Sequence, residues 1–193
     1  MKNSPWIFAA LLAVGVVWRV AAALDWTLVN FAPFTALAFC GAAGLRDARG
    51  LAVAVLTVAG SDLWINAHYA EQYGYTWTAA GALLRLAALG AATGLGALVS
   101  RRPWAIAFWS GSVASTLLFF AVTNTAAWVA DPFYAKTAAG WWQALTIGHP
   151  EFPPTFLFLA RSLVGDLAFT GLCALWSLAD ARRAAPLPVH AAP

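Results

Sequence analysis

Charged residues are scarce in this chain of 193 residues, because Asp, Glu, Lys and Arg together make up only 10% of it. Soluble domains carry about 25%. One stretch, residues 103–130, contains no charged residue at all, although roughly 20 apolar residues in a helix suffice to cross a hydrocarbon core. A soluble surface helix of that length would need a polar face. The scarcity of charge therefore excludes an ordinary soluble domain and predicts an integral membrane protein.

Cysteine, histidine and the common catalytic motifs are also rare or missing. The two cysteines, Cys40 and Cys173, lie within apolar runs, which argues against a disulfide framework. The three histidines form no pair at metal-ligand spacing, and the sequence has no HExxH, GxSxG or Walker motif. We therefore predict a protein that is not an enzyme, with no catalytic residue, metal or cofactor. An intramembrane enzyme that uses Asp62 or Asp166 as acid or base is the weakest alternative.

Apolar residues, in contrast, make up 62% of the chain and gather in six runs separated by short polar segments. This pattern predicts an all-α fold, a polytopic membrane bundle of six transmembrane helices. We expect one domain, residues 1–183, followed by a disordered tail, residues 184–193. The predicted spans are residues 5–24, 31–45, 51–66, 76–99, 104–130 and 155–179. Residues 134–147, which are rich in Trp and Ala, are expected to form a short helix at the membrane surface.

Basic residues are distributed unevenly among the segments outside these spans. Seven fall at the amino terminus, in the second and fourth connections or in the carboxyl tail: Lys2, Arg46, Arg49, Arg101, Arg102, Arg182 and Arg183. The other three connections hold a single one, Lys136. Because short basic loops stay on the cytoplasmic side, we predict a multi-pass protein of the bacterial inner membrane with both termini cytoplasmic. The same clustering explains the net charge of +3 without a nucleic-acid partner.

The first apolar run also has some features of a cleaved secretory signal. Lys2, the run 6–17 and the small residues 21–23 follow the order of such a signal. Arg19, however, lies between the run and the cleavage site, and cleavage would leave five spans. We therefore keep the run as the first transmembrane helix.

Ionisable side chains inside membrane spans cost about 2.5–3.5 kcal/mol each on insertion scales, so each needs an explanation. This chain has five: Arg19, Asp62, Arg85, Arg161 and Asp166. At about 1.5 Å per residue, four of the five lie in the outer half or at the centre of their spans. Two explanations are open. The two aspartates pair with Arg85 and Arg161 and lock helices together, or several of these groups bind a polar solute in an outward-facing cavity.

Polar residues recur at one-turn spacing within the spans, which places them on shared helix faces. The sets are Asp62 with Asn66, Ser112 with Thr116 and Asn124, and Ser162 with Asp166 and Thr170. We predict that a solute is bound by Asp62, Asn66, His68, Arg85, Asn124, Arg161 and Asp166. Three arginines against two aspartates within the spans indicate an anionic solute.

Several short motifs carry a family resemblance. They are Asn30-Phe31-Ala32-Pro33, Ser61-Asp62 with His68, Thr123-Asn124 with Trp128, Tyr134 with Thr137 and Gly140, and Gly165-Asp166-Leu167 with Thr170. In this order they resemble a family of small bacterial membrane transport proteins related to the substrate-binding S-components of energy-coupling factor (ECF) vitamin transporters. The resemblance covers residues 30–174. It implies a six-helix S-component-like fold with an outward-facing solute site.

The resemblance also implies a partner. S-components of the ECF type dock a membrane coupling subunit, which works with ATPases, through an AxxxA motif on the first helix; Ala9 and Ala13 match that motif. The leading prediction is thus a substrate-binding membrane transport protein that captures a small vitamin-like or anionic metabolite. The alternative is a non-transporting membrane scaffold or interaction protein whose buried charge pairs only fix helix packing.

Overall fold

The computed structural model describes residues 5–24, 34–45, 48–73, 78–99 and 104–184. Helix is the only regular secondary structure in these ranges, which confirms the predicted all-α fold class. The helices are α1 (Pro5–Leu24), α2 (Phe34–Leu45), α3 (Ala48–Tyr73), α4 (Ala79–Val99), α5 (Trp104–Ala130), α6 (Ala138–Thr146) and α7 (Thr155–Ala184). The predicted disordered tail, apart from Ala184, lies outside the described residues, as does the Asn30–Pro33 motif.

Helix limits agree with the predicted spans except where polar residues continue a helix. The first and fifth runs, 5–24 and 104–130, begin and end as predicted. In contrast, α3 continues to Tyr73, past the predicted end at residue 66. The added segment contains neither Gly nor Pro and is rich in Ala, Glu and Gln, which favour helix. The apolar run therefore ends before the helix does, and the same holds for the last turns of α7.

The short helix expected within residues 134–147 is α6. The Thr137 hydroxyl caps its N-terminus by accepting a hydrogen bond from the backbone N–H of Gly140 at 3.2 Å. Gly140 has to be glycine here, because a Cβ at this position would lie 2.0 Å from the carbonyl oxygen of Ala135. Tyr134, in the connection that leads to α6, is buried. The motif of Tyr134, Thr137 and Gly140 therefore builds the corner between α5 and α6.

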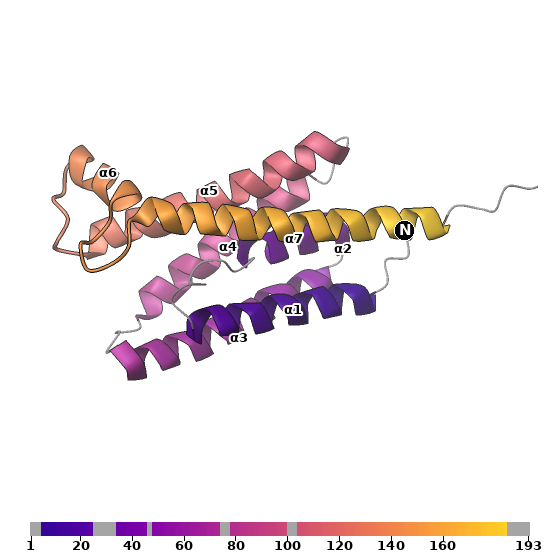
Figure 1. The fold of residues 1–193 in the computed structure, drawn as a ribbon, viewed down its shortest axis with the longest axis horizontal. Helices are drawn as coiled ribbons and strands as arrows, with labels where there is room; N and C mark the ends of the chain where they lie inside the picture. The colour runs from indigo at the N-terminus through magenta and orange to yellow at the C-terminus, as the bar shows by residue number, and fades with distance from the viewer. Residues whose placement is uncertain (1–4, 25–33, 46–47, 74–77, 100–103, 185–193) are drawn as a thin grey trace, which may run out of the picture.

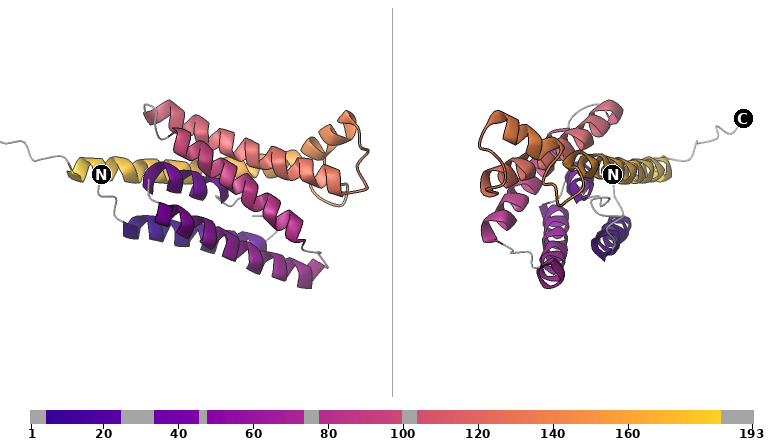
Figure 2. Two further views of the ribbon diagram at one scale, coloured as in Figure 1. Left: turned by 180° about the vertical axis from the view of Figure 1, so that it is seen from behind. Right: turned by 60° about the vertical axis from the view of Figure 1, so that its left-hand side comes forward.

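Helices α1 to α5 and α7 alternate in direction along the bundle (Figure 1). The first residues of α1 and the last residues of α7 lie at one end, and α6 lies at the opposite end (Figure 1). The remaining views show α1 and α3 side by side, on the other side of the bundle from α4 and α5 (Figure 2). We call the end that carries α6 the α6 end.

Helix α2 occupies the centre of the bundle. It contacts α1, α3, α4, α5 and α7, and its residues from Thr35 to Cys40 are all buried. The main hydrophobic cluster forms around it, from Leu12 of α1, Leu37 and Phe39 of α2, and Phe169 and Cys173 of α7. With only 12 residues, α2 is about 18 Å long, so it does not extend along the whole bundle.

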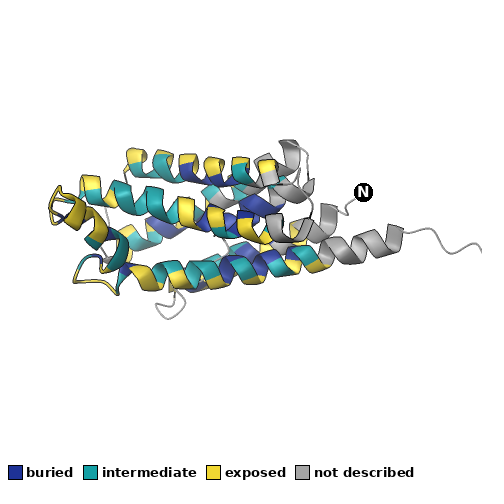
Figure 3. Cartoon of the chain, turned by 90° about the horizontal axis from the view of Figure 1, so that it is seen from above, coloured by how far each residue is buried: buried dark blue, intermediate teal, exposed yellow. Residues whose placement is uncertain are grey.

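Large apolar side chains are exposed on the bundle, and many polar side chains are buried in it. The buried residues lie toward the interior and the exposed ones on the outer faces (Figure 3). The exposed large residues include Val17, Leu56, Leu63, Leu83, Leu98, Val129, Val164 and Leu175, each at least 56% exposed. The buried polar residues are Thr35, Ser61, Asn66, Thr93, Ser112, Ser115, Thr116, Thr155, Asp166 and Thr170. A soluble protein shows the reverse distribution of large apolar residues.

Two helical segments among the described residues are long and apolar enough to cross a membrane, namely Phe108–Ala130 and Thr155–Leu175. Only 11% and 28% of their apolar windows are buried within the bundle. The core helix of a soluble protein would be mostly buried, whereas a lipid-facing helix leaves its apolar side chains on the surface. These two helices therefore favour association of the protein with a membrane.

Candidate solute-binding cavity

A cavity of about 440 Å³ lies inside the bundle and is lined by residues from six helices, α1 to α5 and α7. Its lining residues are Arg19, Ala22, Ala23, Thr35, Asp62, Ile65, Asn66, Tyr69, Arg85, Thr116, Phe119, Phe120, Thr123, Asn124, Phe158, Ser162 and Asp166. They come from the later parts of α1, α3 and α5 and from the first parts of α2, α4 and α7. Because the helices alternate in direction, all these parts lie in the half of the bundle near the α6 end (Figure 1).

Three charged side chains from three helices meet at one side of the cavity. An Nη2 hydrogen of Arg19 is donated to Oδ1 of Asp62, and Nε of Arg85 lies 3.3 Å from Oδ2 of the same carboxylate. Arg85 also donates from Nη2 to the side-chain oxygen of Asn66 at 3.5 Å. We call Arg19, Asp62 and Arg85 the charged triad. Two guanidinium groups against one carboxylate leave the triad with one surplus positive charge.

Asp166 has different partners, because it closes the N-terminus of α2. Its Oδ1 accepts a hydrogen bond from the backbone N–H of Ala36 at 2.9 Å. Its Oδ2 accepts from the hydroxyls of Thr35 and Thr116, the latter at 2.7 Å. The first N–H groups of a helix lack partners inside the helix and carry a partial positive charge, so a carboxylate is favourable there. The charge of Asp166 is therefore compensated by α2 and by hydroxyls, not by an arginine.

The polar faces predicted on the fifth and last spans, which are α5 and α7, pack against each other next to Asp166. The hydroxyls of Ser112 and Thr170 lie 2.8 Å apart, and Thr116 reaches Asp166 across the same interface. Cys40 of α2 points its thiol at the Thr170 hydroxyl, at 4.0 Å. These contacts give the buried hydroxyls their hydrogen-bond partners, as an apolar interior requires.

Aromatic side chains and an amide form the rest of the lining. Phe119 and Phe120 come from α5, Phe158 from α7 and Tyr69 from α3. The Asn124 amide nitrogen donates to the carbonyl of Phe120 at 2.9 Å. The side-chain oxygen of Asn124 is then the atom through which this residue can accept a hydrogen bond from a solute.

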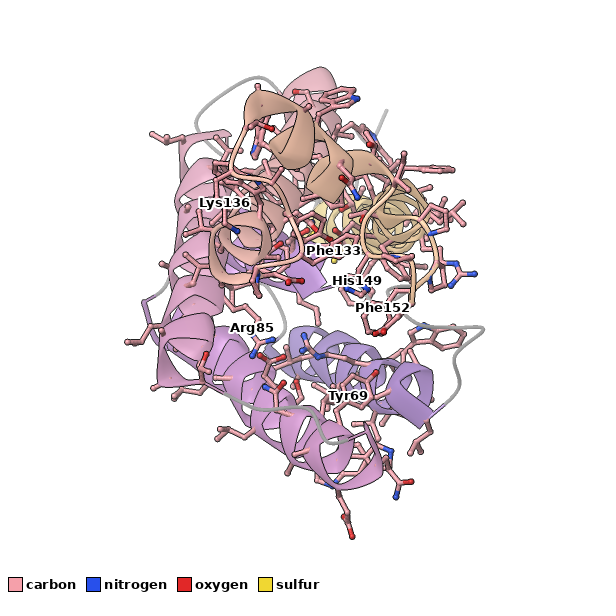
Figure 4. All side chains as sticks on the ribbon, turned by 90° about the vertical axis from the view of Figure 1, so that its left-hand side faces the viewer. Tyr69, Arg85, Phe133, Lys136, His149 and Phe152 are labelled. Atoms are coloured by element: carbon pink, nitrogen blue, oxygen red, sulfur yellow. The ribbon has the colours of Figure 1, made fainter. Side chains whose placement is uncertain are left out.

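The segments before and after α6 lie at the α6 end of the bundle (Figure 1). Seen from the α6 end, Phe133, His149 and Phe152 lie close together above the space into which Arg85 points (Figure 4). The ring centroids of Phe133 and His149 are 4.2 Å apart, and His149 Nδ1 lies 3.8 Å from a carboxylate oxygen of Glu151. Burial, together with the nearby Asp131 carboxylate, raises the pKa of the Tyr134 phenol.

Five of the seven residues predicted to bind a solute line the cavity: Asp62, Asn66, Arg85, Asn124 and Asp166. Their role in binding stays a prediction. The other two do not line it. His68 stacks on the Trp64 ring, with a centroid distance of 5.4 Å and an interplanar angle of 1°, and Arg161 is adjacent to the lining residue Ser162.

The anticipated pairing of the aspartates with Arg85 and Arg161 is correct for only one of the two pairs. Asp62 does pair with Arg85, but its second partner is Arg19, which the sequence places near the outer end of its span. Asp166 takes hydroxyl and backbone partners instead of Arg161. Within the described ranges, no three His, Cys, Asp or Glu side chains come together as a metal site would require.

Comparison with known proteins gives a family but no function. No curated protein and no solved structure matches the chain. One family model does, over residues 1–187, which is nearly the whole sequence. The chain therefore belongs to DUF6580, a family of unknown function.

Proposed function

We propose that this protein is a multi-pass membrane protein that binds a small solute from the outer side of the membrane, in the manner of an ECF S-component. One observation carries the proposal: a cavity of about 440 Å³ is lined by charged and polar groups from six helices. This volume falls within the ~300–1,000 Å³ typical of small-molecule sites. A space of this size, with a few convergent polar and charged groups, suits a polar solute.

The distribution of side chains supports a bundle in which the long helices cross the membrane. Large apolar residues are exposed on α1, α3, α4, α5 and α7, and these helices have 20 to 30 residues each. At about 1.5 Å per residue, each is at least ~30 Å long, the thickness of a hydrocarbon core. The shorter α2 is surrounded by five other helices, so its ends need not reach the lipid.

Orientation follows from the charges at the two ends of the bundle. The basic segments at the start of α1 and the end of α7 belong to one end, which the positive-inside rule assigns to the cytoplasm. The α6 end then faces outward, and the cavity lies in the outer half. In this orientation the site can take up a solute from outside the cell.

The partner proposed from the family resemblance is an ECF-type coupling subunit with its ATPases. Ala9 and Ala13 are both exposed on α1, so a helix of a partner could approach the α1 backbone there. They also lie in the part of α1 nearer the cytoplasmic end, where a coupling subunit would act on the bundle.

A membrane scaffold is the second candidate, and the charged triad favours it. Asp62 is already bound by two arginines, and paired charges inside a membrane can serve only to join helices. Mutual pairing alone, however, does not require a cavity of this volume. The two candidates therefore differ in whether a solute occupies the cavity.

Native mass spectrometry of the protein, extracted in mild detergent, tests the proposal. We expect a small molecule to co-purify with the wild type and to be lost in Arg85→Ala and Asn124→Ala. The matched control is Arg182→Ala, which removes a cation in the last turn of α7 and should keep the bound molecule. Size-exclusion chromatography should show all variants folded and monodisperse. If the wild type carries no molecule, or if both cavity variants keep it, the scaffold candidate replaces the proposed function.

A further inference from the structure

The cavity lining combines a charged cluster with three phenylalanine rings, which come from other helices than the cluster. The charged triad comes from α1, α3 and α4, whereas Phe119 and Phe120 come from α5 and Phe158 from α7. A solute in the cavity therefore meets both guanidinium groups and aromatic rings.

The charges of the lining select the sign of the solute. Asp166 also lines the cavity, but its Oδ1 accepts from the Ala36 N–H and its Oδ2 from the hydroxyls of Thr35 and Thr116, so its carboxylate is held at the N-terminus of α2. Asp62 uses both of its oxygens on Arg19 and Arg85. Across the whole lining two arginines face two aspartates, so the surplus positive charge is local to the triad, and an anion bound there would neutralise it.

Arg85 is the arginine placed to meet the anion. Its side chain is 27% exposed, compared with 12% for Arg19. Its Nη2 contact with Asn66, at 3.5 Å, is long for a hydrogen bond and is easily exchanged for an oxygen of a solute. A guanidinium binds a carboxylate well because two parallel N–H groups match its two oxygens.

Resting on the proposed function, we propose that the solute is a small aromatic monoanion. Its carboxylate binds Arg85, and its ring packs against Phe119, Phe120 and Phe158. Stacked and edge-to-face aromatic pairs add to the free energy of burial. The cavity volume of about 440 Å³ lies at the small end of ligand sites, which suits a compact metabolite better than a lipid or a peptide.

Four probes of defined charge and shape test this assignment by isothermal titration calorimetry on the detergent-purified wild type, freed of bound solute by dialysis. Benzoate, benzamide and benzylammonium share one ring and are anionic, neutral and cationic, and acetate has the charge without the ring. We expect benzoate to bind about tenfold or more tightly than each of the others, because only benzoate offers both a charged oxygen pair and a ring.

Variants test which residue binds the carboxylate. Arg85→Gln should raise the Kd for benzoate by about tenfold or more and leave that for benzamide unchanged. Arg85→Lys should restore part of the affinity, and Arg182→Gln should change neither Kd.

Equal binding of benzoate and benzamide by the wild type would overturn the anionic assignment while leaving the cavity a binding site. Acetate as tight as benzoate would overturn the aromatic assignment. Failure of all four probes to bind would overturn the proposed solute class, even if native mass spectrometry finds another co-purified molecule and so supports the proposed function.

Discussion

Asp62 and Asp166 show how two buried carboxylates in one bundle take different roles. Asp62 sits between two arginines of neighbouring helices, so its charge is balanced inside the cavity lining. Asp166 instead binds the N-terminus of the central helix. Both carboxylates have the polar partners that an apolar interior requires, but only Asp62 has arginine partners, which outnumber it two to one within the triad. At the scale of single residues, the cavity therefore combines one ionic cluster with one helix cap.

Replacing Asp166 with Ala should lower the stability of the protein, because the Ala36 N–H and two hydroxyls would lose their acceptor. We expect a loss of about 1–3 kcal/mol, measured as a lower Tm of the detergent-purified protein. Asp166→Asn should lose less, since the amide oxygen still accepts one of the three hydrogen bonds. If Asp166→Ala keeps the wild-type Tm but releases the co-purified molecule, Asp166 binds the solute directly and does not act as a cap.

At the scale of helices, the glycine at the corner between α5 and α6 is a specific requirement of the fold. Gly140→Ala should disrupt the start of α6, because its Cβ would lie 2.0 Å from a backbone carbonyl oxygen. We expect faster hydrogen exchange across α6 and an increase in proteolysis there. Gly90→Ala is the control: nothing lies within 4 Å of its Cβ, and alanine favours helix over glycine by roughly 0.5–1 kcal/mol. Equal exchange in the Gly140→Ala variant and the wild type would show that the corner tolerates a Cβ.

The helices themselves could be predicted from the sequence because long runs without charge are rare outside membranes. Five polar residues of the lining were also predictable, because ionisable and amide residues inside such runs are few and several recur at one-turn spacing. The rotation of each helix about its axis could not be predicted from the sequence. Along an α-helix, adjacent residues point about 100° apart, and the cavity takes Ser162 and Tyr69 rather than their neighbours Arg161 and His68.

The aromatic lining was beyond prediction for a related reason. Phe119, Phe120 and Phe158 have the same residue type as phenylalanines exposed on the bundle, such as Phe156. Composition and spacing give no signal that separates a ring facing a cavity from one facing lipid. Arg19 was missed as a partner of Asp62 because its position near the end of a span suggested that its side chain reaches the membrane surface.

At the scale of the whole molecule, the proposed topology makes a direct prediction. A reporter that is active only in the cytoplasm should be active when fused in the connection 100–103 or at the carboxyl terminus. A reporter that is active only outside the cytoplasm should be active when fused in the connection 74–77. The physical reason is the concentration of basic residues at one end of the bundle. A carboxyl-terminal fusion that is active only outside would reverse the bundle and turn the cavity toward the cytoplasm.

The claim that the cavity binds a solute is tested most directly by an experimental structure of the protein in lipid nanodiscs, purified with its co-extracted small molecule. The binding proposal predicts density for that molecule between the charged triad and Phe119, with an oxygen within about 3 Å of an Arg85 nitrogen. A cavity closed by protein side chains or filled only by water, with Arg85 in contact only with Asp62 and Asn66, would contradict the binding proposal.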